Sequence, residues 1–160
     1  MKIRRAADKD IPGVLSLLSQ VLEVHAKIRP DIFLSGTTKY GREELEEMFK
    51  DDERPVYVAV DDAGAVTGYA FCQLKDIKAD TMICKRSVYI DDLCVDEASR
   101  GKHIATDLFE HVKTEAKKLG CRDITLNVWE GNEGAFSFYR SMGMTPRSTT
   151  MEYDLDGQDI

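Results

Sequence analysis

The chain has 160 residues, with 22 Lys and Arg against 29 Asp and Glu, and a formal net charge of −7 at pH 7. This length predicts one domain over residues 1–160, and 42% hydrophobic with 32% charged residues is typical of globular proteins, not of disordered or disulfide-stabilised chains. The acidic balance and the lack of a Lys/Arg run or a long apolar stretch in the sequence argue against nucleic-acid and membrane partners and predict a cytoplasmic protein.

Helical periodicity dominates the first third of the chain. After a short predicted strand over 2–6, Pro12 occupies a first-turn position, and apolar residues then recur at steps of three and four. This spacing predicts an amphipathic helix whose buried face carries Ile11, Val14, Leu15, Leu18, Val21 and Leu22. A second, shorter helix is predicted over 42–50, and the connection between the two helices has no regular pattern.

From residue 56 the period changes to two, which is typical of strands. We predict a hairpin over 55–77 and a longer strand over 86–96. A helix ended by Gly120, a strand over 123–129, a helix over 132–142 and one or two strands over 144–155 complete the chain. The order β-α-α-β-β-β-α-β-α-β predicts an α/β fold with one mixed sheet and helices on its faces.

The cysteines and histidines give no metal-site pattern. The spacing of the four cysteines matches neither a zinc site nor a redox pair, so we predict reduced thiols and no metal at Cys72, Cys84, Cys94 and Cys121. Cys72 and Cys94 stand in apolar runs, where burial is the expected role of a thiol. His25 and His111 are expected to be ordinary helix residues.

The clearest chemical signal is a strand, an acidic turn and a helix over 89–112, with Arg100, Gly101, Lys102 and His103 at the predicted helix start. Free N–H groups and the positive end of a helix dipole favour an anion, and the glycine permits close approach of a ligand to the backbone. A diphosphate fits such a site. The alternative is a plain strand-to-helix turn with solvated bases. The sequence contains neither a Walker loop nor a GxGxxG dinucleotide fingerprint.

This stretch resembles the GNAT N-acetyltransferases, which transfer an acyl group from acyl-coenzyme A to an amine. The family pattern Gln/Arg-x-x-Gly-x-Gly/Ala reads here Arg100-Gly101-Lys102-His103-Ile104-Ala105, with His103 in place of the first glycine. The family's second pattern, N-x-x-A-x-x-F-Y-x-x-x-G-F, matches residues 132–144. The resemblance covers nearly the whole chain and implies a GNAT-like, mostly antiparallel sheet flanked by helices.

The resemblance also implies a site for acetyl-CoA. The strand end at Leu93, Cys94 and Val95 would face the pantetheine arm, and the N–H of Leu93 would polarise the thioester carbonyl. Asn132 would contact the cofactor through its side chain, and Tyr139 would lie close to the sulfur. The pyrophosphate would be wrapped, mainly by main-chain N–H groups, by Arg100, Gly101, Lys102, His103, Ile104, Ala105 and Thr106.

Aminolysis of a thioester needs a neutral amine, a polarised carbonyl and a proton for the departing thiolate. A tyrosine, with a reference pKa of about 10, stays protonated at neutral pH, so we predict Tyr139 as the general acid; the alternative is a core aromatic. As the base we favour Asp91 over Asp92, because the alternation of side chains along a strand puts Asp91 on the face of Leu93 and Val95. The alternative is a carboxylate that only faces solvent or pairs with a lysine.

His103 has two interpretations. If its imidazole points outward, diphosphate binding survives, and a cationic form contacts a phosphate; if it points inward, affinity for coenzyme A falls and the domain is degenerate. We favour the outward orientation, because Gly101 and Ala105 remain small and main-chain N–H groups do not depend on residue identity.

The sequence thus predicts an acetyl-CoA-dependent N-acetyltransferase that acts on a primary amine of a small molecule or peptide, by direct attack in a ternary complex. A GNAT-like module that senses acyl-CoA without transferring the acyl group is the alternative, and the lack of a Walker lysine disfavours a phosphotransferase. The charge of −7 suits a cationic amine. By analogy with similar folds, the β-like segment 146–155 is expected to complete the sheet edge of a homodimer.

Overall fold

One five-stranded sheet organises residues 1–157, the part of the chain that this computed structural model describes. The strands follow one another across the sheet in chain order, and all neighbours are antiparallel except the last two, which run parallel. They are β1 (Lys2–Arg5), β2 (Val56–Val60), β3 (Val66–Ile77), β4 (Lys85–Val95) and β5 (Asp123–Leu126). The prediction of a mixed, mostly antiparallel sheet is confirmed.

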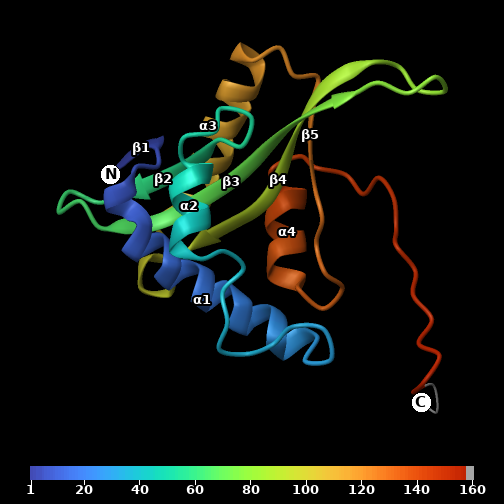
Figure 1. Ribbon diagram of the computed structural model, residues 1–160, viewed down its shortest axis with the longest axis horizontal. Coiled ribbons are helices and arrows are strands. Elements are labelled where there is room, and N and C mark those ends of the chain that lie inside the picture. Colours follow the sequence, from blue (N-terminus) through green and yellow to red (C-terminus); the bar gives the residue numbers. More distant parts are fainter. Residues whose placement is uncertain (158–160) are drawn as a thin grey trace.

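Helices cover both faces of this sheet (Figure 1). On one face lie α1 (Ile11–Ile28) and α2 (Arg42–Met48), and on the other lie α3 (Ile104–Lys118) and α4 (Glu133–Ser141). Short 3-10 helices, Asp8–Asp10 and Glu97–Ser99, come before α1 and α3. Among residues 1–157, no helix combines the length and apolar character that crossing a bilayer requires.

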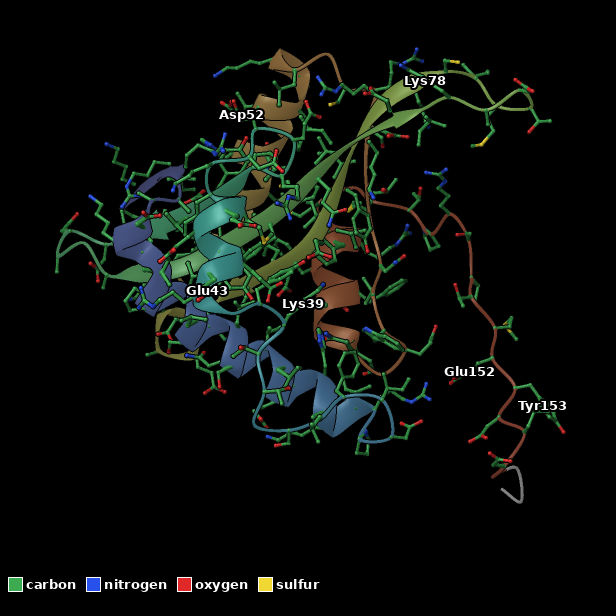
Figure 2. The ribbon with its side chains drawn as sticks, in the orientation of Figure 1. Lys39, Glu43, Asp52, Lys78, Glu152 and Tyr153 are labelled. Carbon is green, nitrogen blue, oxygen red and sulfur yellow. The ribbon has the colours of Figure 1, made fainter. Side chains whose placement is uncertain are left out.

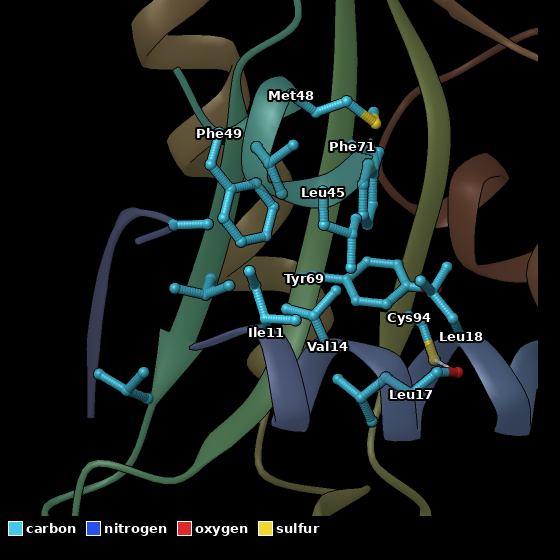
Figure 3. Close-up of a cluster of buried hydrophobic side chains, with 14 residues drawn as sticks. Ile11, Val14, Leu17, Leu18, Leu45, Met48, Phe49, Tyr69, Phe71 and Cys94 are labelled. Carbon is cyan, nitrogen blue, oxygen red and sulfur yellow. Dashed lines mark hydrogen bonds between the residues drawn. The ribbon is translucent and has the colours of Figure 1, made fainter. Parts of the chain in front are cut away.

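Strand β2 contributes to a hydrophobic core on each side of the sheet. All five of its residues are buried. Its first, third and fifth side chains belong to the core under α1 and α2, and its second and fourth to the core under α3. Figure 3 shows the first core, where Val14, Leu17 and Leu18 of α1 pack near Tyr69 and Phe71 of β3. The helical spacing of the apolar residues is therefore what attaches α1 to the sheet.

Several element boundaries differ from the predicted ones. Helix α1 ends at Ile28, two residues before Pro30, whereas β5 ends at Leu126 instead of residue 129. Residues 100–103 form a turn, so that α3 begins at Ile104 rather than at Arg100. The basic residues predicted to open this helix consequently precede it.

The segment 145–157 forms neither of the strands predicted for the end of the chain. Figure 1 shows it running away from the body of the molecule beyond α4. Its alternating apolar residues are exposed, with Met151 at 85%, Tyr153 at 77% and Leu155 at 88%. A strand needs a neighbouring backbone for its hydrogen bonds, and within residues 1–157 no strand pairs with this segment. The prediction of C-terminal strands is therefore wrong for the described chain.

Candidate active site

Strand β4 contains a bulge at its two aspartates. In the pairing with β3, Ile90 and Asp92 have partner residues, whereas Asp91 between them is an extra residue. An extra residue interrupts the alternation of side chains, and Ile90 and Leu93 consequently pack in the same core, under α3. The expectation that Asp91 shares the strand face of Leu93 and Val95 is therefore wrong.

Both aspartates face the side of the sheet covered by α1 and α2. Asp91 accepts a hydrogen bond from the Tyr40 hydroxyl at 2.6 Å and forms an ion pair with Lys39 Nζ at 2.8 Å. Asp92 accepts a hydrogen bond from the Tyr69 hydroxyl at 2.7 Å. Two carboxylates from consecutive residues are thus presented on one face, which regular alternation would not permit.

The two carboxylates differ in their surroundings. Asp91 carries a cationic partner, whereas burial raises the pKa of Asp92 to about 6, against the smaller opposing effects of Tyr69 and Lys39. Burial, together with the hydrogen bond to Asp91, also raises the pKa of Tyr40 well above its usual range. Near neutral pH, Asp92 is consequently a carboxylate poised to take up a proton.

Strands β4 and β5 pair over only part of their length. Their parallel ladder runs from Ser87 opposite Asp123 to Ile90 opposite Leu126 and stops there. Beyond Ile90 the strands diverge, with α4 beside the opening (Figure 1). The segment 91–95 keeps its pairing with β3 and has no β5 partner on its other edge. An extended ligand with amide groups can therefore bind along this edge as a strand does.

Of the three residues predicted at the strand end, Leu93 and Val95 pack toward the α3 core, and Cys94 faces α1. Cys94 is 8% exposed, and its Sγ lies 3.8 Å from the carbonyl oxygen of Leu17. Burial raises the pKa of Cys94 to about 12, so the thiol stays protonated at neutral pH. The thiolate is the reactive form of cysteine, so a thiol that is protonated and buried is unreactive. Cys94 therefore has the properties of a core residue.

The turn before α3 builds a cavity of about 240 Å³. Lining residues from the turn and the first helical turn include Arg100, Gly101, His103, Ile104, Ala105 and Thr106. The first backbone bond of the helix is donated by Asp107 N to His103 O at 3.0 Å, and no side chain caps the preceding N–H groups. Gly101, with φ of +83°, has open space where a Cβ would stand. These features fit a diphosphate, because uncapped N–H groups at a helix start bind anions.

His103 occupies a left-handed backbone conformation, with φ of 61° and ψ of 21°. Within residues 1–157 it is the one residue other than glycine with a positive φ. The backbone has therefore kept the conformation that the family's glycine adopts readily. His103 is exposed and is one of the residues that line the cavity. The outward orientation of its imidazole stays a prediction.

Helix α4 carries the two predicted residues of the second motif. Asn132 caps the helix, because its Oδ1 accepts a hydrogen bond from Ala135 N at 3.3 Å, which leaves the amide nitrogen for another partner. Tyr139 packs against Phe109 of α3, with 6.3 Å between ring centroids. Burial, followed by the charge of Asp92, raises the pKa of Tyr139 well above its usual range. Tyr139 therefore remains a proton donor at any physiological pH.

Three residues of the site, Lys39, Tyr40 and Tyr69, were not predicted. Tyr69 reads in the sequence as one more apolar strand residue, and the other two lie in the connection between α1 and α2, which has no periodic pattern. Only the topology brings this connection to β4. Within residues 1–157, no group of three or more His, Cys, Asp or Glu side chains is arranged to hold a metal ion.

Comparisons with known proteins show the family and the fold. The model of the Acetyltransferase (GNAT) family matches residues 20–144. A mutant of the BH1408 protein from Bacillus halodurans superposes with a TM-score of 0.92 at 35% identity, covering 97% of this chain and 99% of that chain. Glucosamine-6-phosphate N-acetyltransferase from Arabidopsis thaliana has a TM-score of 0.71 at 22% identity, with coverage of 97% and 98%, which shows a shared fold.

A further match comes from the sequence alone. N-alpha-acetyltransferase 30 of Schizosaccharomyces pombe is 33% identical over 86 residues, which are 49% of this chain and 57% of that protein. The match thus spans little more than half the length of this relative.

Proposed function

Because this chain belongs to the GNAT family of acetyl-CoA-dependent N-acetyltransferases, we propose that it acetylates a primary amine of a small molecule or peptide by direct attack in a ternary complex. The observation that carries the proposal is the pair of carboxylates at the β4 bulge, beside the open β4 edge. The acceptor amine and the acetyl donor would then both bind to the segment 91–95 of β4.

The donor site consists of the open β4 edge and the cavity before α3. Acetyl-CoA, when bound, supplies the acetyl thioester. Main-chain N–H groups at the start of α3 would hold its diphosphate, with the cationic side chains of Arg100 and Lys102 nearby. The N–H of Leu93 would polarise the thioester carbonyl. The free amide nitrogen of Asn132 is available for a further contact. This arrangement depends mainly on backbone groups, and His103 leaves them in place.

The two aspartates have separate tasks in the proposed reaction. Asp91, which already holds an ammonium group, binds the acceptor amine. Asp92 takes the proton that the amine must lose, because burial gives this carboxylate a pKa of about 6. This assignment replaces Asp91 by Asp92 as the base, since the alternation that favoured Asp91 does not exist at the bulge.

Tyr139 is the proposed acid. Burial raises the pKa of Tyr139 and so makes its hydroxyl a weaker acid than that of a tyrosine in water. The sulfur that leaves in the same buried environment is also desolvated and becomes more basic. A protonated hydroxyl at this position therefore stabilises the developing thiolate by a hydrogen bond and supplies the proton.

A comparison of Tyr139→Phe with the wild type tests the proposal. Thiol release from acetyl-CoA should fall by roughly 100-fold or more, while calorimetry finds coenzyme A binding near the wild-type value. Equal rates in the two proteins would remove Tyr139 from the mechanism. Wild-type protein that binds acetyl-CoA but releases no thiol with a broad panel of amines would instead be a sensor.

The acceptor is a cationic amine in this proposal. The two enzymes named above differ in acceptor, one being an N-alpha-acetyltransferase and the other acting on glucosamine-6-phosphate, so the shared fold leaves the acceptor open. The carboxylates of this chain favour an ammonium group without a nearby anion.

We also propose a homodimer in which segment 145–157 of one copy pairs with the β5 edge of the other. Strand β5 is at the end of the sheet and is paired on one side only, with β4. The segment has the alternating apolar residues of a strand and is exposed in the single chain.

The proposed location is the cytoplasm. All four cysteines are free thiols, which is typical of proteins in a reducing compartment.

A further inference from the structure

A lysine of the chain itself lies at the position proposed for the acceptor amine. Lys39 belongs to the connection between α1 and α2, and its Nζ is 2.8 Å from Asp91 Oδ1. The neighbouring Tyr40 fixes this connection on the sheet, because its hydroxyl donates to Asp91 Oδ2 at 2.6 Å and its ring stacks on Phe71 with 5.5 Å between centroids. Figure 2 shows Lys39 between the ribbons of α2 and α4.

The chemistry of this lysine matches that of the proposed substrate. Its side chain ends in a primary amine on a flexible aliphatic stem and is 47% exposed, whereas the Asp91 side chain is 11% exposed. The amine therefore retains freedom to move while the carboxylate does not.

Lys39 is also close to the groups that the reaction requires. Asp91 is two residues before Leu93, so the two lie at most roughly 7 Å apart along the chain. The positive charge of Lys39 lowers the pKa of Asp92, and the charge of Asp92 raises the pKa of Tyr139. The amine, the proposed base and the proposed acid consequently belong to one cluster of groups that influence one another electrostatically.

We propose that this protein acetylates its own Lys39, an inference that rests on the proposed function. The Lys39 ammonium gives one proton to Asp92, and the neutral amine attacks the thioester carbonyl carbon. A C–N bond forms and the C–S bond breaks, and the departing sulfur takes a proton from Tyr139. The acetylated nitrogen loses its second proton, which restores the Tyr139 hydroxyl, and Asp92 returns the first proton to solvent. The products are N-acetyl-lysine and free coenzyme A, so no further reactant is needed.

Acetylation changes the acceptor site. An amide carries no charge, so the ion pair between Lys39 and Asp91 is lost and Asp91 keeps only its hydrogen bond with Tyr40. The carboxylate is then free for an external ammonium group. Self-acetylation thereby converts an occupied amine site into an open one.

The experiment uses the full chain and acetyl-CoA without an added amine. Intact mass and peptide mapping should find one acetyl group, at Lys39, and its rate should not depend on protein concentration because the reaction is intramolecular. Lys78, exposed in the β3–β4 connection (Figure 2), reports the uncatalysed reaction, and Lys39 should react at least about tenfold faster. Tyr139→Phe should slow acetylation of Lys39 and leave that of Lys78 unchanged.

Two matched variants complete the design. Lys39→Arg should remove the acetylation, and Lys78→Arg should preserve it. Equal rates at Lys39 and Lys78, or a Lys39 rate that increases with protein concentration, would overturn the inference. If added amines are acetylated while Lys39 remains unmodified, self-acetylation is wrong and the proposed function stands. If neither reaction occurs, both are wrong.

Discussion

Asp91 and Asp92 carry the same functional group in different surroundings. Asp91 forms an ion pair with Lys39 and accepts a hydrogen bond from Tyr40, whereas Asp92 has no cation in direct contact, accepts a hydrogen bond from the neutral Tyr69 hydroxyl and has a pKa of about 6. Desolvation thus separates two neighbouring carboxylates into one that binds a cation and one that accepts a proton.

This difference predicts the pH dependence of the activity. Below about pH 6 Asp92 is protonated and cannot accept a proton, so kcat/KM should fall on the acid side with an apparent pKa of about 6. Asp92→Asn should remove this limb and lower kcat/KM by roughly 100-fold. Steady-state rates from pH 5 to pH 9, with the exposed Asp62→Asn as control, check the expectation. An unchanged acid limb in Asp92→Asn would assign it to another group.

Folding remains possible without the Asp92 charge. A carboxyl whose folded pKa lies above its unfolded value stabilises the protein most at low pH, and that contribution is lost as pH rises through about 6. Above pH 6 the ionised Asp92 therefore costs stability. We expect Asp92→Asn to unfold no more easily than the wild type at pH 8, which separates a loss of activity from a loss of structure.

His103 predicts a gain of stability on substitution by glycine. A left-handed conformation costs roughly 1–2 kcal/mol for a residue with a Cβ, so His103→Gly should raise the free energy of unfolding by about 1 kcal/mol. His103→Ala keeps the Cβ and should show no such gain. Thermal or urea unfolding of the three proteins measures the difference. If the alanine variant is stabilised as much as the glycine variant, backbone strain is not the cause.

Helix α3 approaches the sheet closely at Gly68 of β3. A Cβ at this position would lie 3.0 Å from the Cys94 carbonyl oxygen, 3.0 Å from Leu108 Cδ1 and 3.2 Å from Ile104 Cγ2. The absence of a side chain thus determines how near the first turns of α3 lie to the sheet. Because the same turns line the cavity proposed for the diphosphate, this contact links packing to donor binding.

Gly68→Ala should therefore disturb both properties. We expect a loss of about 1–3 kcal/mol in the free energy of unfolding and weaker coenzyme A binding, since α3 must move away from the sheet. Gly134→Ala in α4 is the control, because a Cβ there meets nothing within 4 Å and should be neutral or stabilising. Urea unfolding and calorimetry test both variants. Wild-type coenzyme A affinity in a destabilised Gly68→Ala protein would show that the two properties are independent.

The elements that form within the chain were predictable, and the departures have local physical causes. Periodicity identified α1, the hairpin and β4, because each buries an amphipathic or alternating pattern. The bulge was not predictable, because Asp91-Asp92 carries no signal of the extra residue and only the register with β3 defines it. The same holds for Lys39, which reaches the site through the path of an irregular connection.

In the molecule as a whole, the outer edge of β5 and one apolar segment lack a neighbouring strand. Within the described residues, β1 and β5 are the two outer strands of the sheet, each paired on one side only, and segment 145–157 contacts the body through the ion pair of Arg29 with Glu152. The predicted C-terminal strand failed because alternation of apolar residues does not say which chain provides the neighbouring strand. A second copy satisfies the edge and the segment together.

The proposed dimer predicts the oligomeric state of three proteins. Light scattering should find twice the monomer mass for the wild type. Replacement of Met151, Tyr153 and Leu155 by serine should give monomers, because the segment loses its apolar face. Replacement of Met82 and Ile83, which are exposed in the β3–β4 connection, should leave the dimer intact. A wild-type protein that stays monomeric at every concentration would contradict the proposal.

The open edge of β4 also bears on how such a site can diversify. A main-chain N–H belongs to every amino acid except proline, so almost any substitution over 91–95 leaves the groups of this edge in place. The side chains of Asp91 and Asp92, which lie outside the two hydrophobic cores, can then vary without loss of the donor. New acceptor preferences can arise by single substitutions at the bulge, because the proposed donor binds the strand backbone whereas the acceptor amine binds its side chains.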